Sequence, residues 1–147
     1  MDAGINFEFV QDNQSLSQFG AVRGLHFQAP PFEQGKLVRV VKGAVLDVVV
    51  DIRKNSETYG QHYAIELNEE NMLQFWIPPG FAHGFYVQSE QADCFYKCTE
   101  YFDPTDSHVI RWDDPTLNIS WPLIEGKPIV SPNDVAGCEL MQARYFL

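Results

Sequence analysis

Several side chains that suit proton transfer or anion binding gather in one short segment, RGLHFQAPPFEQGKLVRVVKG, residues 23–43. They are Arg23, His26, Gln28, Lys36 and Arg39. A histidine has a reference pKa of about 6.5 and can remove a proton near neutral pH. A fixed lysine can stabilise negative charge as it develops on an oxygen. The interior of a sheet does not usually collect such groups, so either they face solvent or they line a cavity that binds an anion.

Two further residues would complete proton transfer at His26. Tyr96, in CFYKC, is a candidate proton donor on a strand. Asp134 is a candidate for the carboxylate that orients the other ring nitrogen of the histidine and stabilises the imidazolium. The residue types leave alternatives open. His26 could equally be a histidine that packs in the core. Tyr96 could be an aromatic wall residue whose hydroxyl reaches water, and Lys36 could be a solvated lysine on a strand.

The segment IPPGFAHGF, residues 77–85, predicts a tight turn that leads His83 onto a strand. A histidine in this place is either a metal ligand or a donor that faces a bound ligand. A metal would need two or three more converging ligands. The four histidines are isolated from one another, with no HxH pair, so we expect no metal and no other cofactor.

Adjacent carboxylates occur in RWDDPTLNISWP, residues 111–122. A carboxylate pair can serve glycoside hydrolysis. However, neighbouring residues on a strand point to opposite faces, which argues against cooperation between Asp113 and Asp114. We expect these two residues to make turn and cap hydrogen bonds, and Trp112 and Trp121 to seal an edge of the core.

Strand periodicity dominates the elements that must position these residues. In KLVRVVKGAVLDVVVDI, residues 36–52, two β-branched runs flank a break at residues 42–43. Side chains alternate across a strand. One face of the second run therefore carries Val45, Asp47, Val49 and Asp51, and the other carries Leu46, Val48 and Val50.

The remaining periodic segments indicate an all-β fold. We predict further strands over residues 62–67, 72–77, 83–87 and 92–99, and one short helix over residues 133–146, capped by Asn133 or Ser131. Many short strands with frequent turns are typical of a sandwich or barrel. A barrel of about eight strands has room for one small ligand, so we expect His26 and Lys36 to point into its mouth.

Length and composition narrow the function. The 147 residues predict a single domain spanning residues 1–147. The formal net charge of −10 and the pI of about 4.6 argue against nucleic acid as a partner, so any anionic ligand must be held by a local cationic pocket. No run of 18 apolar residues predicts a membrane span, and the N-terminal residues do not resemble a secretion signal.

The three cysteines fit a reducing cytoplasm, because they are odd in number and lack zinc-like pairing. Cys94 and Cys98 are four residues apart on a predicted strand and therefore share a face. We interpret both as small buried apolar residues with free thiols.

Several motifs in order resemble one known family. VQDNQSLSQFGAVRGLHFQAPPFEQGKLVRVVKGAVLDVVVDIRKNSETYGQ, WIPPGFAHGF, FYKCTEYFDP and IRWDDPTLNISWP are similar to segments of the dTDP-4-dehydrorhamnose 3,5-epimerase family, over about residues 9–134. The resemblance implies a cupin-type jelly-roll barrel that works as a homodimer without a metal. It also implies a substrate, a dTDP-linked 4-keto-6-deoxy sugar, whose C3 and C5 centres are inverted to give dTDP-4-dehydrorhamnose.

The resemblance also assigns roles to residues. It implies that His26 is the base, that Asp134 orients it, that Lys36 holds the C4 oxygen as it becomes an enolate, and that Tyr96 returns a proton on the opposite face. The implied substrate-binding residues are Arg23, Gln11 and Asn13 at the nucleotide diphosphate, His83 near the sugar, and Gln28. Arginine suits a diphosphate because its guanidinium can bind two oxygens at once.

Three features depart from the family pattern. Relatives usually carry an RGxFxExF-like motif in a longer N-terminal segment that contacts the neighbouring subunit, and the printed chain contains no such motif. A second tyrosine that often follows the catalytic one corresponds here to Tyr101 or Phe102, and a lysine that often precedes the aspartate corresponds to Asn133. The alternatives are therefore a single-centre epimerase or keto-isomerase on a related nucleotide sugar, or a non-catalytic cupin that binds a nucleotide sugar.

Overall fold

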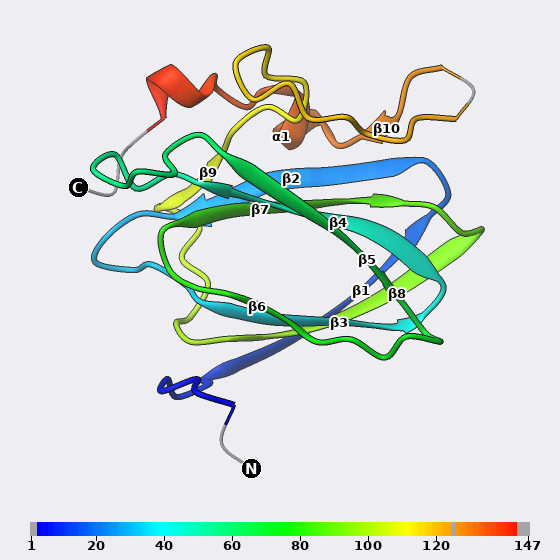
Figure 1. Ribbon diagram of the computed structural model, residues 1–147, viewed down its shortest axis with the longest axis horizontal. Coiled ribbons are helices and arrows are strands. Elements are labelled where there is room, and N and C mark those ends of the chain that lie inside the picture. Colours follow the sequence, from blue (N-terminus) through cyan, green and yellow to red (C-terminus); the bar gives the residue numbers. More distant parts are fainter. Residues whose placement is uncertain (1–2, 125, 144–147) are drawn as a thin grey trace.

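The computed structural model describes residues 3–124 and 126–143, which form two facing β-sheets (Figure 1). The four-stranded sheet has the order β1 (Gln11–Gln18), β8 (Gln91–Cys98), β3 (Lys36–Lys42) and β6 (Phe75–Ile77). The second sheet has the order β10 (Ile129–Val130), β2 (Ala21–Gln28), β7 (Phe81–Val87), β4 (Ala44–Asp51) and β5 (His62–Asn68), and β9 (Ser107–Val109) also pairs with β2. This arrangement confirms the expected all-β jelly-roll barrel.

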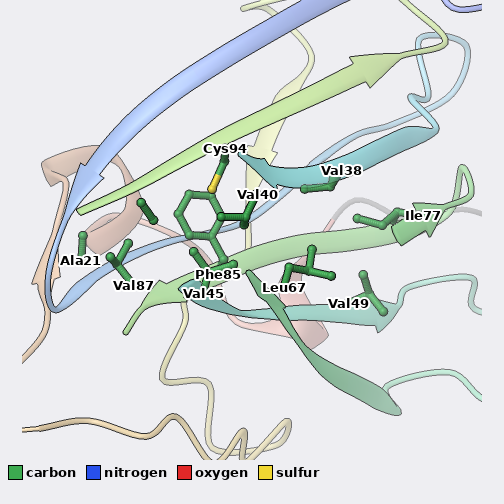
Figure 2. Packing of buried hydrophobic residues seen from close by; sticks show 11 residues of the cluster. Ala21, Val38, Val40, Val45, Val49, Leu67, Ile77, Phe85, Val87 and Cys94 are labelled. Carbon is green, nitrogen blue, oxygen red and sulfur yellow. The ribbon is translucent and has the colours of Figure 1, made fainter. Parts of the chain in front are cut away.

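A hydrophobic core fills one part of the space between the sheets. β4 contributes Val45 and Val49 to it, and the four-stranded sheet contributes Val38, Val40 and Cys94 (Figure 2). Val45 and Val49 therefore share the inner face, as the alternation predicts. Burying one valine side chain fully stabilises the fold by about 1.5–3 kcal/mol, so this cluster holds the two sheets together.

A second core lies on the outer face of the six-stranded sheet. Val48 and Val50 of β4 pack there with Leu25, Ile110 and Leu140. The last two residues belong to the C-terminal part of the chain, which crosses over β2 in Figure 1. Because both faces of β4 are covered, its sequence is apolar almost throughout.

The predicted C-terminal helix is mostly wrong. The structure has a four-residue helix α1 (Pro132–Val135) and a 3₁₀ turn (Leu140–Gln142), and residues 144–146 of the prediction lie outside the described residues. The helix stops because Cys138 forms a β-bridge with Ile110 instead of continuing helical hydrogen bonds. Within residues 3–124 and 126–143, no helix is long and apolar enough to cross a membrane.

The strand predicted over residues 72–77 begins three residues late, at Phe75. The preceding residues form a turn because the Asn68 side chain accepts hydrogen bonds from the backbone N–H groups of Glu70 and Asn71. Met72 then takes a positive φ of 50°, which is incompatible with a regular strand.

Candidate active site

Polar side chains occupy one end of the barrel interior because of the strand register. Lys36 on β3 pairs with Cys98 on β8, which also pairs with Gln11 on β1. In the adjacent row, Asn13 on β1 pairs with Tyr96 on β8. Residues two apart on a strand share a face, so these five side chains face inward together. The same strands carry the apolar core farther along.

These residues line a cavity of about 390 Å³, within the range of ordinary small-ligand sites. The lining comprises Gln11, Asn13, His26, Phe27, Gln28, Gln34, Lys36, Tyr96, Cys98, Phe102, Ser107 and Asn133. Six of the nine predicted site residues are among them: Gln11, Asn13, His26, Gln28, Lys36 and Tyr96. Residues from positions 11 to 133 thus meet at one site.

Asp134 reaches the cavity through His26. Oδ1 of Asp134 lies 2.6 Å from Nε2 of His26, and its Oδ2 accepts a hydrogen bond of 3.2 Å from the backbone N–H of Gly24. Helix α1 holds the carboxylate there, because Ser131 caps the helix by accepting a hydrogen bond from the Asp134 N–H. Burial opposes ionisation of Asp134, but the hydrogen bond from His26 and those from Gly24 and Ser131 outweigh it and lower the pKa of the carboxyl.

A close approach of two strands sets the position of His26. Gly24 has a φ of +117°, and a Cβ atom built on it would lie 2.6 Å from Cα of Gly84 on β7. Only glycine fits such an approach at this φ. The contact locks β2 against β7, where His26 pairs with His83 in the strand register.

His83 is held in a buried pair with Asp47. Nε2 of His83 lies 2.9 Å from Oδ2 of Asp47, and the exposed fractions of the two side chains are 9% and 0%. His83 is not among the residues that line the 390 Å³ cavity. Among residues 3–124 and 126–143, no three His, Cys, Asp or Glu side chains converge as a metal site would require.

Burial shifts the pKa values of Lys36 and Tyr96, which both line the cavity. Burial lowers the pKa of Lys36, while Cys98 and Asp47 act in the opposite direction. No described residue accepts a hydrogen bond from its ammonium group. Burial raises the pKa of Tyr96, so its phenol keeps the proton at neutral pH. The cavity therefore places a lysine that has no hydrogen-bond partner among the described residues beside a protonated phenol.

Arg23 does not line this cavity. Its side chain is exposed and borders a separate depression of about 350 Å³ together with Ser17, Gln18 and Gln91, at the end of β1 and β8 opposite Gln11 and Cys98. Burial dominates the raised pKa of Tyr96, and the positive charge of Arg23 acts on that phenol in the opposite direction. The guanidinium is therefore close enough to influence the site.

Gln28 has partners that the sequence did not indicate. Its side chain is bonded to backbone groups of Phe32, Tyr101 and Asp103. Of the two residues considered for the second tyrosine position, Phe102 lines the cavity and Tyr101 does not.

Some lining residues escaped the sequence analysis, notably Phe27, Gln34 and Ser107. Gln34 lies two positions before Lys36, so strand alternation extended past the end of β3 would have found it. Ser107 follows an irregular segment, and no local pattern points to it.

The fold matches solved cupin-type epimerase structures over more than nine-tenths of this chain, which places it in the class of cupin-type isomerases. The chain belongs to the dTDP-4-dehydrorhamnose 3,5-epimerase family, whose profile matches residues 1–142.

Individual relatives agree. The chain is 46% identical over 144 residues to the dTDP-4-dehydrorhamnose 3,5-epimerase of Shigella flexneri, which covers 98% of this chain and 78% of the relative. The crystal structure of dTDP-6-deoxy-D-glucose-3,5-epimerase RmlC from Legionella pneumophila, in complex with dTDP-4-keto-L-rhamnose, is 52% identical, with a TM-score of 0.92 over 96% of this chain and 74% of that one. ChmJ, a 3'-monoepimerase from Streptomyces bikiniensis, is 32% identical, with a TM-score of 0.85 over 90% of this chain and 67% of that one.

Proposed function

We propose that the chain inverts C3 and C5 of a dTDP-4-keto-6-deoxyhexose, converting dTDP-4-dehydro-6-deoxyglucose to dTDP-4-dehydrorhamnose. The observation that carries this proposal is the 2.6 Å contact between His26 and Asp134 at a cavity that also contains Lys36 and Tyr96. A base, an acid and a fixed cation are the groups that an epimerisation next to a ketone requires. The names of the relatives supply the substrate class.

The first step removes a proton from the carbon next to the ketone. In the structure Nε2 of His26 contacts Asp134, so Nδ1 is the nitrogen left to accept that proton. The C–H electron pair becomes a carbon–carbon double bond, and the C4 oxygen takes the negative charge. Asp134 stabilises the imidazolium, and Lys36 stabilises the enolate oxygen.

The second step returns a proton to the opposite face of the same carbon. Tyr96 donates it from its phenol, and the double-bond electrons form the new C–H bond while the ketone is restored. Protonation from the face opposite the base is what inverts the centre. The charge balance closes when the proton on His26 leaves to solvent and the Tyr96 phenolate takes one up. This chemistry needs no metal, because Lys36 supplies the positive charge.

The nucleotide diphosphate would lie toward Arg23. The chain has a net charge of −10, so a dianion must be held by a local cation. Arg23 is exposed and close enough to act on the Tyr96 phenol that lines the cavity, and a guanidinium can bind two phosphate oxygens. Gln11 and Asn13 line the cavity on the β1 side and could contribute further polar contacts. His83, buried against Asp47 and paired with His26 in the strand register, would lie near the sugar.

A single-centre epimerase is the second candidate, favoured by Phe102. This residue lines the cavity, in a segment where the family often has a second tyrosine, so Tyr96 supplies the one phenolic hydroxyl among the described lining residues. A relative of this chain is itself a 3'-monoepimerase. If inversion at each carbon needs its own proton donor, one centre would exchange faster than the other.

We also propose that the chain forms a homodimer. β1 is an edge strand of the four-stranded sheet, and the outward side chains of that sheet include Leu16, which is 60% exposed, and Val41, which is 38% exposed. An open edge strand beside an apolar surface favours association with a second copy. Sedimentation equilibrium tests this proposal, and a monomer at all accessible concentrations would reject it.

Proton NMR of dTDP-4-keto-6-deoxyglucose with the purified protein in D2O tests the function. We expect the C3 and C5 proton signals to disappear and the signals of the epimerised product to appear. Loss at one carbon alone would support the single-centre candidate. Binding without any exchange would reject catalysis and support a non-catalytic nucleotide-sugar-binding cupin.

A further inference from the structure

The segment from residue 99 to residue 106 crosses from one sheet to the other at the cavity. It connects β8 in the four-stranded sheet to β9, which pairs with the six-stranded sheet (Figure 1). The N–H of Thr99 still donates to the carbonyl of Gly35, but from residue 100 to Asp103 the segment has no regular secondary structure, so ladder hydrogen bonds do not fix that part. It carries Phe102, whose ring lines the cavity although the residue is 56% exposed. Because more than half of the residue is exposed, packing constrains Phe102 less than it would constrain a buried phenylalanine.

Gln28 fixes the middle of this segment. Its Nε2 donates to the backbone carbonyl of Phe32 at 2.7 Å and to that of Tyr101 at 3.2 Å, and its Oε1 accepts from the N–H of Asp103 at 2.9 Å. Gln28 is only 4% exposed. Both hydrogens of its amide are therefore used within the protein, and none remains to donate to a ligand.

Two more glutamines hold the same segment from other directions. Nε2 of Gln34 donates to the backbone carbonyl of Glu100 at 2.7 Å. Oε1 of Gln11 accepts from the backbone N–H of Phe102 at 2.9 Å, while its Nε2 donates to Oδ1 of Asn13 at 2.9 Å. Four consecutive residues of the segment, 100–103, are thus each bonded through the backbone to a glutamine side chain that lines the cavity.

We propose that Gln11, Gln28 and Gln34 are positioning residues that set the place of the Phe102 ring against the sugar, and so set the relative rates of reaction at C3 and C5. This inference rests on the proposed function. The glutamines come from β1, β2 and the loop before β3, so they tie the segment to both sheets that carry the reactive groups. An aromatic wall fixed in this way limits how the sugar ring can turn between the base and the acid.

The ratio of deuterium exchange at C3 to exchange at C5 is the decisive readout. Both rates come from the same active molecules, so loss of folded protein cannot change their ratio. We expect Gln28→Met, which keeps side-chain length but removes three hydrogen bonds, to change the ratio and to raise KM by about 2- to 10-fold. Gln34→Met removes one such bond and should change both in the same direction by less. If Gln28→Met does not fold, the exchange ratio of Gln34→Met decides whether the glutamines position Phe102.

Gln14→Met is the matched control. Gln14 lies on β1 like Gln11 but is exposed on the outer face, where it bonds to Asp93. We expect its exchange ratio and KM to equal those of the wild type. An unchanged ratio in both Gln28→Met and Gln34→Met would overturn the positioning role.

A double variant tests whether the glutamines act through Phe102. Phe102→Ala should itself change the ratio, and adding Gln28→Met to it should change the ratio no further. Independent, multiplicative effects would show that Gln28 acts by another route and would reject the inference. No exchange in the wild type would reject the proposed function, whereas wild-type exchange with unaltered variants rejects only the inference.

Discussion

Oδ1 of Asp134 lies 2.6 Å from Nε2 of His26, although 108 residues separate the two along the chain. The contact joins helix α1 to strand β2, and the side-chain exposed fractions are 4% for Asp134 and 38% for His26. The carboxylate of this pair is shielded from water, whereas the imidazole is open to the cavity. This geometry supports the proposal that the histidine meets a ligand and that the aspartate orients it.

Replacing Asp134 by asparagine should slow proton exchange by about 10²- to 10⁴-fold, because the neutral amide neither fixes the tautomer of His26 nor stabilises the imidazolium. His26→Ala should cost at least as much, and the double variant no more than His26→Ala alone, since the two residues act as one unit. Deuterium incorporation followed by NMR measures the rates, and circular dichroism checks the fold.

The control for this pair is Asp113→Asn. Asp113 also accepts hydrogen bonds from a basic side chain, that of Arg111, but the two side chains are 39% and 41% exposed and neither residue lines the cavity. We expect exchange in Asp113→Asn to match the wild type. An Asp134→Asn protein that exchanges within about twofold of the wild type would refute the base assignment.

Tyr96→Phe should separate proton removal from inversion. The variant keeps the ring that lines the cavity and loses the hydroxyl whose pKa burial raises. We expect deuterium exchange to persist in part, while the yield of inverted product falls by about 10²-fold, a typical loss for one acid group. NMR reports both quantities in a single sample. Tyr63→Phe, on an exposed site of β5, is the control, and an equal loss of exchange and inversion in Tyr96→Phe would contradict a purely acid role.

Lys36→Met should lower kcat by about 10²- to 10³-fold, because a fixed cation is removed from the place where the enolate charge develops. The same change should leave the free energy of unfolding equal or higher, since methionine can be buried there without desolvating a charge. Urea unfolding measures the second effect. A destabilised variant with normal kcat would show that Lys36 is structural.

The wild type should also lose activity at alkaline pH through Lys36. Burial lowers the pKa of this lysine below its ordinary value of 10.5, and the ammonium form is present only below the lowered pKa. As pH rises through it, the cation disappears and kcat falls. A kcat profile measured toward pH 10.5 should therefore decline before an exposed lysine would titrate. A flat profile would mean that the cation is not used.

The strands of the fold were largely predictable because their signal is local. In β4 the alternation assigned Val45 and Val49 to one face and Val48 and Val50 to the other, and the structure buries the two pairs in separate cores. The C-terminal helix was mispredicted because the competing interaction is distant: Cys138 bonds to the strand-like backbone at Val109 and Arg111. No window around residue 138 contains that information.

The site residues also fall into those that a local sequence pattern predicts and those that it does not. Lys36 and Tyr96 follow from inward-facing positions on predicted strands, and both line the cavity. Asp134 could not be placed by local pattern, because its carboxylate meets His26 through a helix that docks from the far end of the chain. The partners of Gln28 were equally hidden, since Tyr101 and Asp103 belong to an irregular segment with no periodicity to read.

Asp51 should be a determinant of stability at neutral pH. Its carboxylate, at the end of β4, accepts hydrogen bonds from the guanidinium of Arg53 at 2.7 and 2.9 Å and from the hydroxyls of Ser56 and Thr58, both at 2.6 Å. Arg53 in turn lies 4.7 Å from the centre of the Phe81 ring, at the start of β7, the strand that carries His83. Only the carboxylate of this cluster is buried, and Arg53 and Thr58 are exposed, so Asp51→Asn should cost about 1–3 kcal/mol of unfolding free energy.

The pH dependence of that cost has a definite sign. Burial would raise the pKa of Asp51, but the hydrogen bonds from Arg53, Ser56 and Thr58 outweigh it and hold the pKa well below the ordinary 3.8. A carboxyl whose pKa is lower in the folded state contributes its stability above the unfolded pKa and loses it as pH falls toward the folded one. The difference between wild type and Asp51→Asn should therefore be constant above about pH 5 and shrink below about pH 4. Urea unfolding of both proteins across this range measures the difference, in which other titrating groups largely cancel. A difference that does not depend on pH would show that the charge of Asp51 is not what stabilises the cluster.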